Sequence, residues 1–500
     1  MPRVSAVLGM LSLERDGGVA LQRQLYAALR EAILAGRLPP GTRLPSTRTL
    51  AGDLGAARNT VVGAFEQLAA EGYVEARVGD GTRVAAVLPE TLLHARRAHV
   101  QQPAGLGAPE LSRRGRAIVA ARRPLPDVGR RAFQPGLPAL EEFPRETWAR
   151  LVARRSRVPA RGSLGYGHPA GLPPLRQAIA AYVGAARGVT CAAEQVIVVA
   201  GAQAGLDLAC RLLLDAGDAA WMEEPGYLGA RGALLAAGAQ PVPVAVDAEG
   251  IDVDAGRRAG RPARLVYVTP SHQFPLGVTM TLARRLALLA WAAEAGAWVL
   301  EDDYDSEYRY AGRPIAAMQG LDPAGRVVYA GTFSKTMFPA LRAGYLVVPP
   351  GLVDAFGAAV RLTGHQVPAA EQAALADFIA EGHFASHVRR MRALYAGRRE
   401  HLVAALRRRL SGLLEVVPSE GGMQLAATLA TGVDDAAASR AAAGEGLVAP
   451  PLSMYHLGAR RRRGLHLGYA SVREREIVPA VDRLSRALET VAPRRSRRAL

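Results

Sequence analysis

Hydrophobic residues near the start of the chain recur at helical spacing. Leu21, Leu25, Leu29 and Ile33 are four positions apart, so they fall on one face of a helix. Gly36 follows the last of them, and glycine commonly ends a helix. The pattern therefore predicts an amphipathic helix over about 21–35 that buries one face.

Two more helices and a hairpin are predicted in the first 85 residues. Apolar positions indicate a short helix over about 45–54, a turn at Gly55 and a third helix over about 58–71. Short strand-like runs then lie on either side of the glycine-containing turn at 78–82. Helix, short helix, tight turn, helix and hairpin is the order of a winged helix-turn-helix.

Later in the chain the apolar residues form short continuous runs. Residues 195–199 predict a buried parallel strand that leads into a helix near 200–206. Residues 265–268 and 297–300 are strand-like in the same way. Continuous apolar runs of this length are typical of a sheet that is covered on both faces.

The length of the chain supports a division into domains. A chain of 500 residues is too long for one ordinary domain. Residues 86–130 mix Pro, Gly, Ala, Gln and Arg without a sustained period, which is typical of a linker. We therefore expect a winged helix-turn-helix domain over 15–85, a linker over 86–130 and a large domain over 131–490.

Charge and cysteine content indicate the kind of partner and the cellular location to expect. The formal net charge is +17, which favours a polyanionic partner, although an arginine-rich composition raises the charge in any case. Cys191 and Cys210 offer neither a disulfide framework nor metal-ligand spacing, so we expect no metal. No apolar run reaches the roughly 18–20 residues of a membrane span, and the chain start lacks a signal-peptide pattern. We expect a cytoplasmic protein.

Lys335 is the only lysine in the sequence, because the remaining Lys and Arg residues are all arginine. A guanidinium stays charged in proteins, whereas a primary amine can lose its proton. A neutral amine can form a Schiff base with an aldehyde, and pyridoxal 5'-phosphate (PLP) presents one. We therefore interpret Lys335 as a PLP-binding lysine rather than as a residue left by chance.

Other side chains around Lys335 suit the same cofactor. Asp302 and Tyr304 follow the strand-like run 297–300, at the strand end where open α/β sheets bind ligands. A carboxylate keeps the PLP ring nitrogen protonated, and a hydroxyl can contact the ring oxygen. The residues that we expect near the phosphate are Thr332, Ser334, Arg342 and, at the start of the helix after 195–199, Gly201, Ala202 and Gln203.

The first domain has polar residues suited to DNA. Asn59, the only asparagine, lies beside Arg58 and Thr60 at the start of the third helix, where it can cap the helix or contact a base. Both alternatives remain open from the sequence. The other candidates are Arg48 for phosphates or guanine edges and Ser46 or Thr47 for a phosphate.

Several phrases of the sequence resemble a known family. They are LPSTRTLA and ARNTVVGAFEQL in the first domain, and VTPSHQFPLGVTM, EDDYDSEYRY, GTFSKTMFPALRAGY and EGHFASHVRRMRALY in the large one. They resemble the MocR (GabR-like) branch of the GntR regulators, whose large domain is similar to fold type I aminotransferases. The resemblance covers nearly the whole chain.

The resemblance implies a fold, partners and site residues. It implies an α/β protein, with a winged helix-turn-helix followed by a PLP-binding domain that has a mostly parallel sheet and a smaller C-terminal α+β part. It implies operator DNA, an amine or amino-acid effector and a homodimer. By the same resemblance, Tyr227 stacks on the PLP ring, Tyr166 reaches the partner subunit's phosphate, and Gly79, Gly81 and Thr82 lie near the duplex.

Two positions depart from the aminotransferase pattern. Phe274 stands where those enzymes have an asparagine at the ring hydroxyl, which leaves that contact to Tyr304, with His272 or Gln273 as further candidates. His466 stands at the effector position, where they have an arginine that binds the substrate carboxylate through two donors. We therefore expect a PLP-dependent regulator that senses an amine, an amino acid or PLP itself. The alternative is an active aminotransferase with an appended DNA-binding domain.

Overall fold

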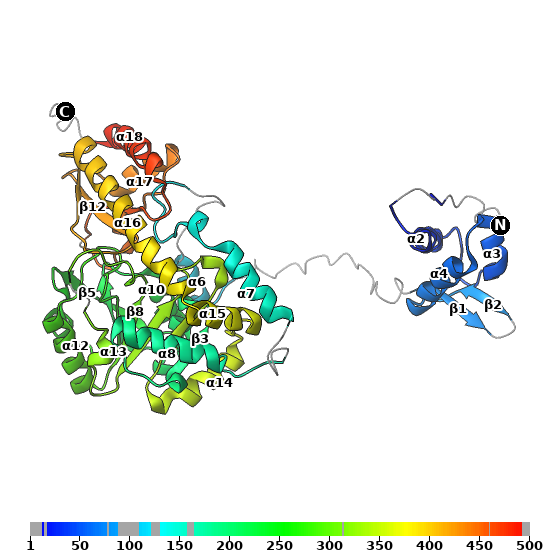
Figure 1. Ribbon diagram of the computed structural model, residues 1–500, viewed down its shortest axis with the longest axis horizontal. Coiled ribbons are helices and arrows are strands. Elements are labelled where there is room, and N and C mark those ends of the chain that lie inside the picture. Colours follow the sequence, from blue (N-terminus) through cyan, green and yellow to red (C-terminus); the bar gives the residue numbers. More distant parts are fainter. Residues whose placement is uncertain are drawn as a thin grey trace. The chain divides into compact units, whose positions relative to one another are not determined.

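The structure consists of two compact units. The computed structural model describes residues 13–14, 18–77, 80–88, 110–121, 131–157, 165–312, 315–459 and 461–492. The first unit is Met1–Glu110 and the second is Leu111–Leu500, and each is described by itself (Figure 1). The boundary between them falls within the segment 86–130 that was expected to be a linker.

The first unit has the predicted order of elements. Its helices are α2 (Leu21–Leu34), α3 (Thr47–Leu54) and α4 (Arg58–Ala70), and its hairpin is β1 (Val74–Arg77) with β2 (Gly81–Val84). One face of α2 is buried at Leu25, Leu29 and Ile33, as the fourfold spacing predicts. These side chains pack against Val61 and Phe65 of α4 in one core, which confirms the winged helix-turn-helix.

An eight-stranded sheet forms the centre of the second unit, in the order β3-β10-β9-β8-β7-β4-β5-β6. Strands β4, β5, β7, β8 and β9 pair in parallel. The strands are β3 (Val196–Val199), β4 (Ala219–Glu224), β5 (Gln240–Asp247), β6 (Gly250–Ile251), β7 (Ala263–Val268), β8 (Trp298–Asp303), β9 (Val327–Thr332) and β10 (Gly344–Val347). The mostly parallel sheet is confirmed.

One strand pairs differently from the prediction. Residues 196–199 form a buried strand, as expected, but β3 pairs with β10 in the antiparallel sense. Since β10 is also antiparallel to β9, β3 runs in the same direction as the parallel strands without being bonded to one. Burial on both faces produces the same apolar run in either case, so the sequence could not distinguish the two pairings.

Helices cover both faces of this sheet. Ile197 and Val199 of β3 pack into a core with α9 (Ala202–Leu213), α10 (Leu228–Ala237) and α14 (Val353–Thr363). Val196 and Val198 point to the opposite face, because successive strand residues alternate. The helices on that face and along the sheet include α7 (Arg145–Arg157), α8 (Pro173–Arg187), α11 (Val253–Arg258), α12 (Leu282–Ala295), α13 (Met318–Leu321) and α15 (Ala369–Ala380).

A smaller α+β part follows at the C-terminal side. The long helix α16 (His383–Arg409) runs between the large sheet and this part (Figure 1). Its elements are the antiparallel strands β11 (Leu414–Val416), β12 (Gln424–Leu429) and β13 (Gly464–Gly468) with helices α17 (Asp435–Gly444) and α18 (Glu474–Val491). The two-part PLP-type fold is thus the observed one.

The expected linker contains one described helix. Helix α6 (Arg113–Ala120) begins at Ser112, whose hydroxyl accepts a hydrogen bond from the N–H of Gly115. It packs on α10 of the second unit. The irregular composition of residues 86–130 did not predict where such a helix would lie, since its hydrophobic residues are few and most of its surface is exposed.

Two further properties concern the part of the chain that the structure describes. Within it, no helix combines the length and apolar character required to cross a membrane. The same residues contain no group of three or more His, Cys, Asp or Glu side chains arranged to hold a metal ion.

Candidate functional site

The ammonium group of Lys335 lies at the carboxyl end of the parallel sheet. The residue follows β9 by three positions, and its Nζ donates a hydrogen bond to the carbonyl of Gly136 at 2.7 Å. Gly136 has φ of 72°, which favours glycine, and a Cβ there would come within 2.8 Å of this nitrogen. The backbone carbonyl of Lys335 accepts from the Tyr308 hydroxyl at 3.2 Å. The amine is therefore held at a defined position.

Asp302 lies on the neighbouring strand and is buried. It pairs with Ala330 across β8 and β9, and its Oδ2 accepts a hydrogen bond from the Tyr267 hydroxyl of β7 at 2.7 Å. Burial raises the pKa of Asp302 to about 7, while the Tyr267 hydrogen bond and the positive charge of Lys335 act in the opposite direction. Its other oxygen, Oδ1, is buried without a hydrogen-bond partner among the described residues.

These features fit PLP. A buried carboxylate with one oxygen still able to accept is suited to the protonated ring nitrogen, because a buried acceptor needs a donor. Lys335 supplies the primary amine in the same region. When bound, PLP supplies an aldehyde carbon that captures amines and a ring that withdraws electrons. Asp302 would hold the ring nitrogen, and Lys335 would hold the aldehyde end.

The hydroxyl of Tyr304 belongs to a small buried network. It donates to the His272 carbonyl at 3.0 Å and lies 3.0 Å from Nδ1 of the same histidine. That Nδ1 also faces Asp305 at 3.1 Å. Gln273 is committed elsewhere, because its amide nitrogen donates to Pro225 and to its own neighbour's carbonyl. Of the two further candidates for the ring hydroxyl, only His272 joins Tyr304.

The start of α9 is the place where the sequence predicts binding of the PLP phosphate, and we refer to it as the phosphate cup. Gly201 precedes this helix with φ of 89°, a conformation that favours glycine, and Ala202 and Gln203 form its first turn. The guanidinium of Arg342 lies about 3.5 Å from where a Cβ on Gly201 would stand, and it donates to the Ala200 carbonyl at 3.1 Å. Helix N–H groups and this guanidinium together suit a phosphate.

The remaining predicted phosphate residues lie at the adjoining strand end. The hydroxyl of Thr332 accepts from the N–H of Ser334 at 3.2 Å, so the two residues form one turn before Lys335. A pocket of about 680 Å³ opens beside the cup. Among the residues that line it are Gln203, Tyr227 and Arg342, with Ile118 and Ala121 from the α6 segment.

Buried aromatic side chains cluster beside Tyr227. Phe274 meets Tyr227 with ring centroids 5.3 Å apart and His466 with centroids 5.1 Å apart, both edge to face. His466 is fully buried in β13, and its Nδ1 lies 3.1 Å from the Tyr455 hydroxyl. The side chain of Gln203 bonds to the Gly229 carbonyl at 2.9 Å, beside the Tyr227 ring. The structure thus brings Tyr227, Phe274 and His466 together.

Tyr166 lies apart from this pocket. Its side chain is 90% exposed, on a loop that lines a separate cavity of about 250 Å³ with His168 and Gln372. The resemblance assigns Tyr166 to the site of a partner subunit, and its exposure is compatible with that expectation.

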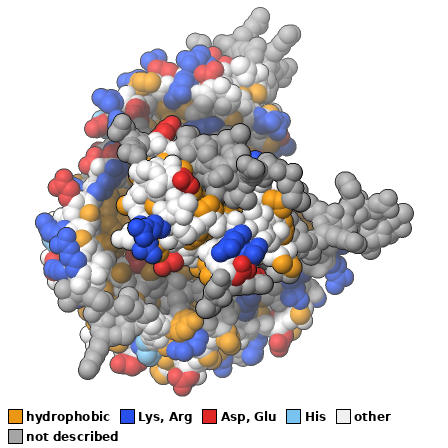
Figure 2. Space-filling model, turned by 90° about the vertical axis from the view of Figure 1, so that its right-hand side faces the viewer, with side chains coloured by type: hydrophobic (Ala, Val, Ile, Leu, Met, Phe, Trp, Pro, Cys, Tyr) orange, Lys and Arg blue, Asp and Glu red, His pale blue; other side chains and the backbone are white. Residues whose placement is uncertain are grey.

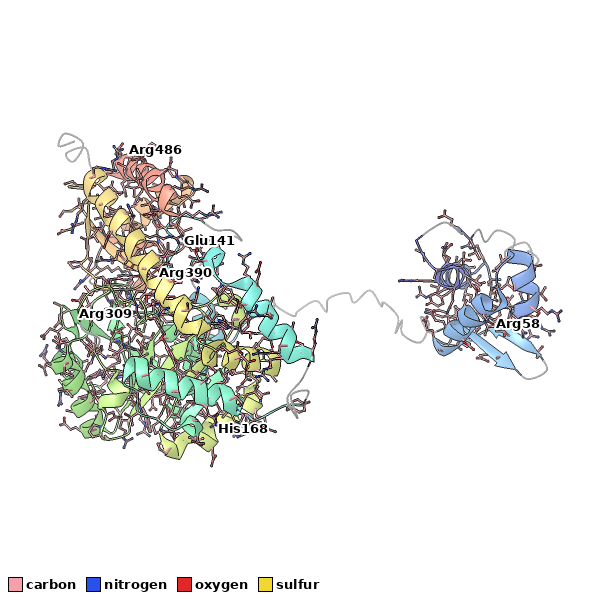
Figure 3. All side chains as sticks on the ribbon, in the orientation of Figure 1. Arg58, Glu141, His168, Arg309, Arg390 and Arg486 are labelled. Carbon is pink, nitrogen blue, oxygen red and sulfur yellow. The ribbon has the colours of Figure 1, made fainter. Side chains whose placement is uncertain are left out.

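The residues expected at DNA lie on the exposed side of α3 and α4. Arg48, Arg58 and Asn59 are exposed, Thr47 and Thr60 are half-buried, and Figure 3 shows Arg58 at the surface. Helix α4 begins after Ala57, which makes no side-chain cap, so the capping alternative for Asn59 is wrong. Asn59 lies two positions beyond the N-cap and is therefore too far into the helix to serve as its cap.

Ser46 has a structural contact of its own. It caps α3, since its hydroxyl accepts from the N–H of Thr49 at 3.1 Å.

On the face drawn in Figure 2, basic side chains form separate groups with acidic ones between them.

The wing is tied to the rest of the first unit. Arg83 bonds to Asp80 at 2.7 Å and to the Gly41 carbonyl at 2.9 Å. Gly81 has φ of 78°, which favours glycine, and Thr82 follows it in β2. Gly79 lies outside the described residues. The sequence did not indicate the Arg83 contacts, because they join segments far apart in the chain.

Other members of the site were also missed. Gly136 and Tyr267 lie far from Lys335 and Asp302 in the sequence, and no local pattern marks their contacts. Asp305 could have been noticed, since it stands in the acidic run after β8. Residues of α6 reach the pocket only because of the docking of that helix on α10.

The fold and site define a class of protein, a winged-helix DNA reader joined to a PLP-binding fold type I domain. Two protein families match the chain in agreement with this class. "Bacterial regulatory proteins, gntR family" matches residues 21–84, and "Aminotransferase class I and II" matches residues 143–484.

Comparison with individual proteins supports the same class. The chain is 48% identical over 479 residues to "Probable rhizopine catabolism regulatory protein MocR" of Rhizobium meliloti, covering 96% of each chain. It is 36% identical to "HTH-type transcriptional regulator TauR" of Rhodobacter capsulatus, covering 95% and 98% of the two chains. A crystal structure of LysN, an α-aminoadipate aminotransferase of Thermus thermophilus, is 29% identical with a TM-score of 0.67, covering 72% and 92%.

The chain belongs to the MocR branch of the GntR family. It is a PLP-dependent, DNA-binding transcriptional regulator with an aminotransferase-like domain.

Proposed function

We propose that this regulator senses an amine or amino-acid effector, or PLP itself, in its aminotransferase-like domain. Binding of the ligand there changes the affinity of the protein for operator DNA. The observation that carries the proposal is the pocket beside the phosphate cup, because Tyr227 and Arg342 line it together with Ile118 of the linker helix. The segment that leads to the DNA-binding unit is therefore part of the wall of the ligand site.

Ligand binding can act on the linker through this wall. Helix α6 is short, its residues are at most half-buried, and its described packing is against α10. Helix α10 begins directly after Tyr227, the residue expected to stack on the PLP ring. A ligand that moves Tyr227 or fills the pocket thus changes the surface on which α6 rests. A ligand shifts the equilibrium between two arrangements of α6 only as far as its affinities for the two arrangements differ.

The site residues have proposed roles. Lys335 binds the aldehyde, Asp302 the ring nitrogen, Tyr304 the ring hydroxyl and Tyr227 the ring face. The phosphate is assigned to Gly201, Ala202, Gln203, Thr332, Ser334 and Arg342, with Tyr166 supplied by the partner of a homodimer. A phosphate has three oxygens that accept strong hydrogen bonds, which helix N–H groups, hydroxyls and a guanidinium together can satisfy.

The DNA contacts are proposed in the same way. Arg48 and Arg58 would contact phosphates or guanine edges, and Asn59 and Thr60 the bases at the start of α4. Ser46, Thr47 and the wing residues Gly79, Gly81 and Thr82 would lie along the backbone. The exposed positions of Arg48, Arg58 and Asn59 support this assignment.

A second candidate is an active aminotransferase with an appended DNA-binding domain. The presence of Lys335 and Asp302 near each other supports amine capture, and slow half-reactions are compatible with it. Phe274 and His466 argue against efficient turnover of amino acids. Phe274 replaces the asparagine expected at the ring hydroxyl, and His466 replaces the arginine expected at the substrate carboxylate. We therefore favour regulation.

Operator binding by the full-length protein tests the proposal. Footprinting upstream of the divergently transcribed gene would locate the operator, and its affinity would be measured for the apoprotein, the PLP-bound protein and the PLP-bound protein with amines. We expect affinities that differ by about fivefold or more, the usual lower range of coupling between sites. Equal affinity in all three states would contradict the proposal.

A further inference from the structure

We infer that the effector is a primary amine that carries no carboxylate group. This inference rests on the proposed amine-sensing function and narrows it. The argument comes from the aromatic wall formed by Tyr227, Phe274, Tyr455 and His466, and from the charges that surround it.

Phe274 closes the position from which a polar side chain would contact a ligand. Its ring lies edge to face against Tyr455 at 5.2 Å and His466 at 5.1 Å, and it is 8% exposed. Its backbone N–H donates to Thr269 at 2.9 Å, which fixes the loop that carries it. This side chain offers a carboxylate no hydrogen bond.

His466 is held as part of this wall. It lies in the middle of β13, paired with Ala426 of β12, and its side chain has no exposure to solvent. Its Nδ1 is within hydrogen-bond distance of the Tyr455 hydroxyl. A histidine cannot present two parallel N–H donors to one carboxylate as an arginine does.

Three acidic side chains lie near the Tyr304 hydroxyl, with Lys335 as a basic neighbour of one of them. Burial raises the pKa of Tyr304 well above its usual value, and the carboxyls of Asp305, Asp302 and Glu223 raise it further, so all three lie close enough to act on this hydroxyl. Asp305 faces His272, and Asp302 faces Lys335. Such surroundings attract an ammonium group and repel a carboxylate.

Three described arginines of the large domain have other contacts. Arg342 donates to the Ala200 carbonyl at the phosphate cup, and Arg187 forms a buried pair with Asp303. Arg462 donates to the Val246 carbonyl at 3.1 Å. A carboxylate that entered the aromatic wall would therefore lose its water without gaining a charged donor from these three side chains, which is unfavourable.

Matched ligand pairs test this inference on the full-length PLP-bound protein. Each pair differs only in the carboxylate: 2-phenylethylamine with phenylalanine, and ethanolamine with serine. Binding is followed by the change in the absorbance spectrum of bound PLP and by the shift in unfolding temperature. We expect at least one amine to bind tenfold or more tightly than its amino acid, and no amino acid to bind more tightly than its amine.

Variants provide an independent measurement. The double variant Phe274→Asn with His466→Arg should improve the affinity for phenylalanine or serine by tenfold or more, because it restores a polar neighbour and a two-donor side chain. His466→Gln, which adds no positive charge, should not. Unfolding temperatures of both variants show whether they are folded.

The outcomes separate this inference from the proposed function. Amino acids that bind as tightly as their amines, or more tightly, would overturn the inference while amine sensing stands. No spectral change and no change in operator affinity with any ligand would overturn both.

Discussion

Asp302 and Asp303 are consecutive buried residues of β8 whose pKa values move in opposite directions. Burial raises the pKa of Asp302 to about 7. Burial acts on Asp303 as well, but the Arg187 guanidinium at 2.7 Å and the Tyr329 hydroxyl outweigh it and hold the pKa of Asp303 below its usual value. Because strand residues alternate, the two carboxyls face different sides of the sheet. Oδ2 of Asp303 pairs with Arg187 and Tyr329, whereas Oδ2 of Asp302 accepts from Tyr267. Oδ1 of each residue is buried without a hydrogen-bond partner among the described residues.

The stability of the apoprotein should fall as the pH rises from about 4 to about 7. Burial raises the pKa of Glu223, Glu301 and Glu307, like that of Asp302, to about 7. In this window the folded state keeps protons that the unfolded state has lost, so rising pH favours unfolding. Unfolding temperatures of the apoprotein between pH 5 and 7.5 would measure the slope.

PLP and Asp302→Asn should each reduce that slope. A protonated ring nitrogen gives the ionised Asp302 a partner, and asparagine removes the titrating group. The same substitution at exposed Asp354 is the matched control and should leave the slope unchanged. Carboxyls with lowered pKa values, such as Asp303, contribute stability that is lost only below about pH 4, so they do not enter this window. An unchanged slope in Asp302→Asn would contradict the assignment.

Lys335→Ala should abolish covalent attachment of PLP. The chain has no other lysine, so no second ε-amine can take its place. Borohydride treatment followed by mass spectrometry would measure the attachment. Lys335→Arg is the control that keeps a positive charge near Asp302, and it should also fail to trap PLP while preserving the fold. Full trapping in either variant would show that Lys335 is not the attachment point.

Arg342→Ala should weaken PLP binding by roughly ten- to hundredfold. Hydrogen bonds to charged groups contribute about 1.5–3 kcal/mol, and Arg342 lies at the phosphate cup. Gly201→Ala should weaken it too, because φ of 89° costs a non-glycine residue about 1–3 kcal/mol. Spectroscopic titration of the apoprotein with PLP measures both. Arg361→Ala on α14, whose side chain is exposed, is a control and should bind PLP normally.

Arg58→Ala should reduce operator affinity, and if the contact is to a phosphate it should also reduce the slope of log affinity against log salt by about 1. Arg58 is exposed at the start of α4. Arg37 pairs with Glu31 at 2.9 Å after α2, and Arg37→Ala should leave binding nearly unchanged. Equal losses in both variants would indicate a general charge effect instead of a contact at α4.

Ile118→Ser should weaken the dependence of operator binding on the ligand. Ile118 lines the pocket from α6, and a polar side chain would loosen that wall. PLP affinity itself should change little, since Ile118 contributes no polar group to the cup. Measuring operator affinity of this variant with and without amine tests the coupling. A response equal to that of the unaltered protein would show that α6 does not carry it.

Local patterns were sufficient to predict most of the fold. The spacing of Leu25, Leu29 and Ile33 identified α2, and the apolar run before Asp302 identified β8, because each element is specified by neighbouring residues. The pairing of β3 was wrong in the sequence interpretation, since burial does not encode strand direction. The capping alternative for Asn59 failed because the helix begins two residues earlier than a cap at Asn59 requires, and a sequence pattern does not fix a helix start that closely.

The site was predictable in its chemistry and less so in its geometry. Lys335, Asp302 and Tyr304 could be selected because their side chains are rare or fall at strand ends. The partners of these residues, Gly136 and His272 among them, come from distant segments that only the folded chain brings close. The edge-to-face arrangement of Phe274 and His466 likewise joins the loop after β7 to strand β13 of the smaller sheet, about 190 residues further along the chain.

The solitary ε-amine, held at the Gly136 carbonyl, also makes this regulator easy to label. Reduction of the Schiff base between PLP and Lys335 would leave one fluorescent pyridoxyl group per chain at a known residue. No other lysine would add a second label. Its emission could then report on the neighbouring aromatic wall while the protein sits on DNA.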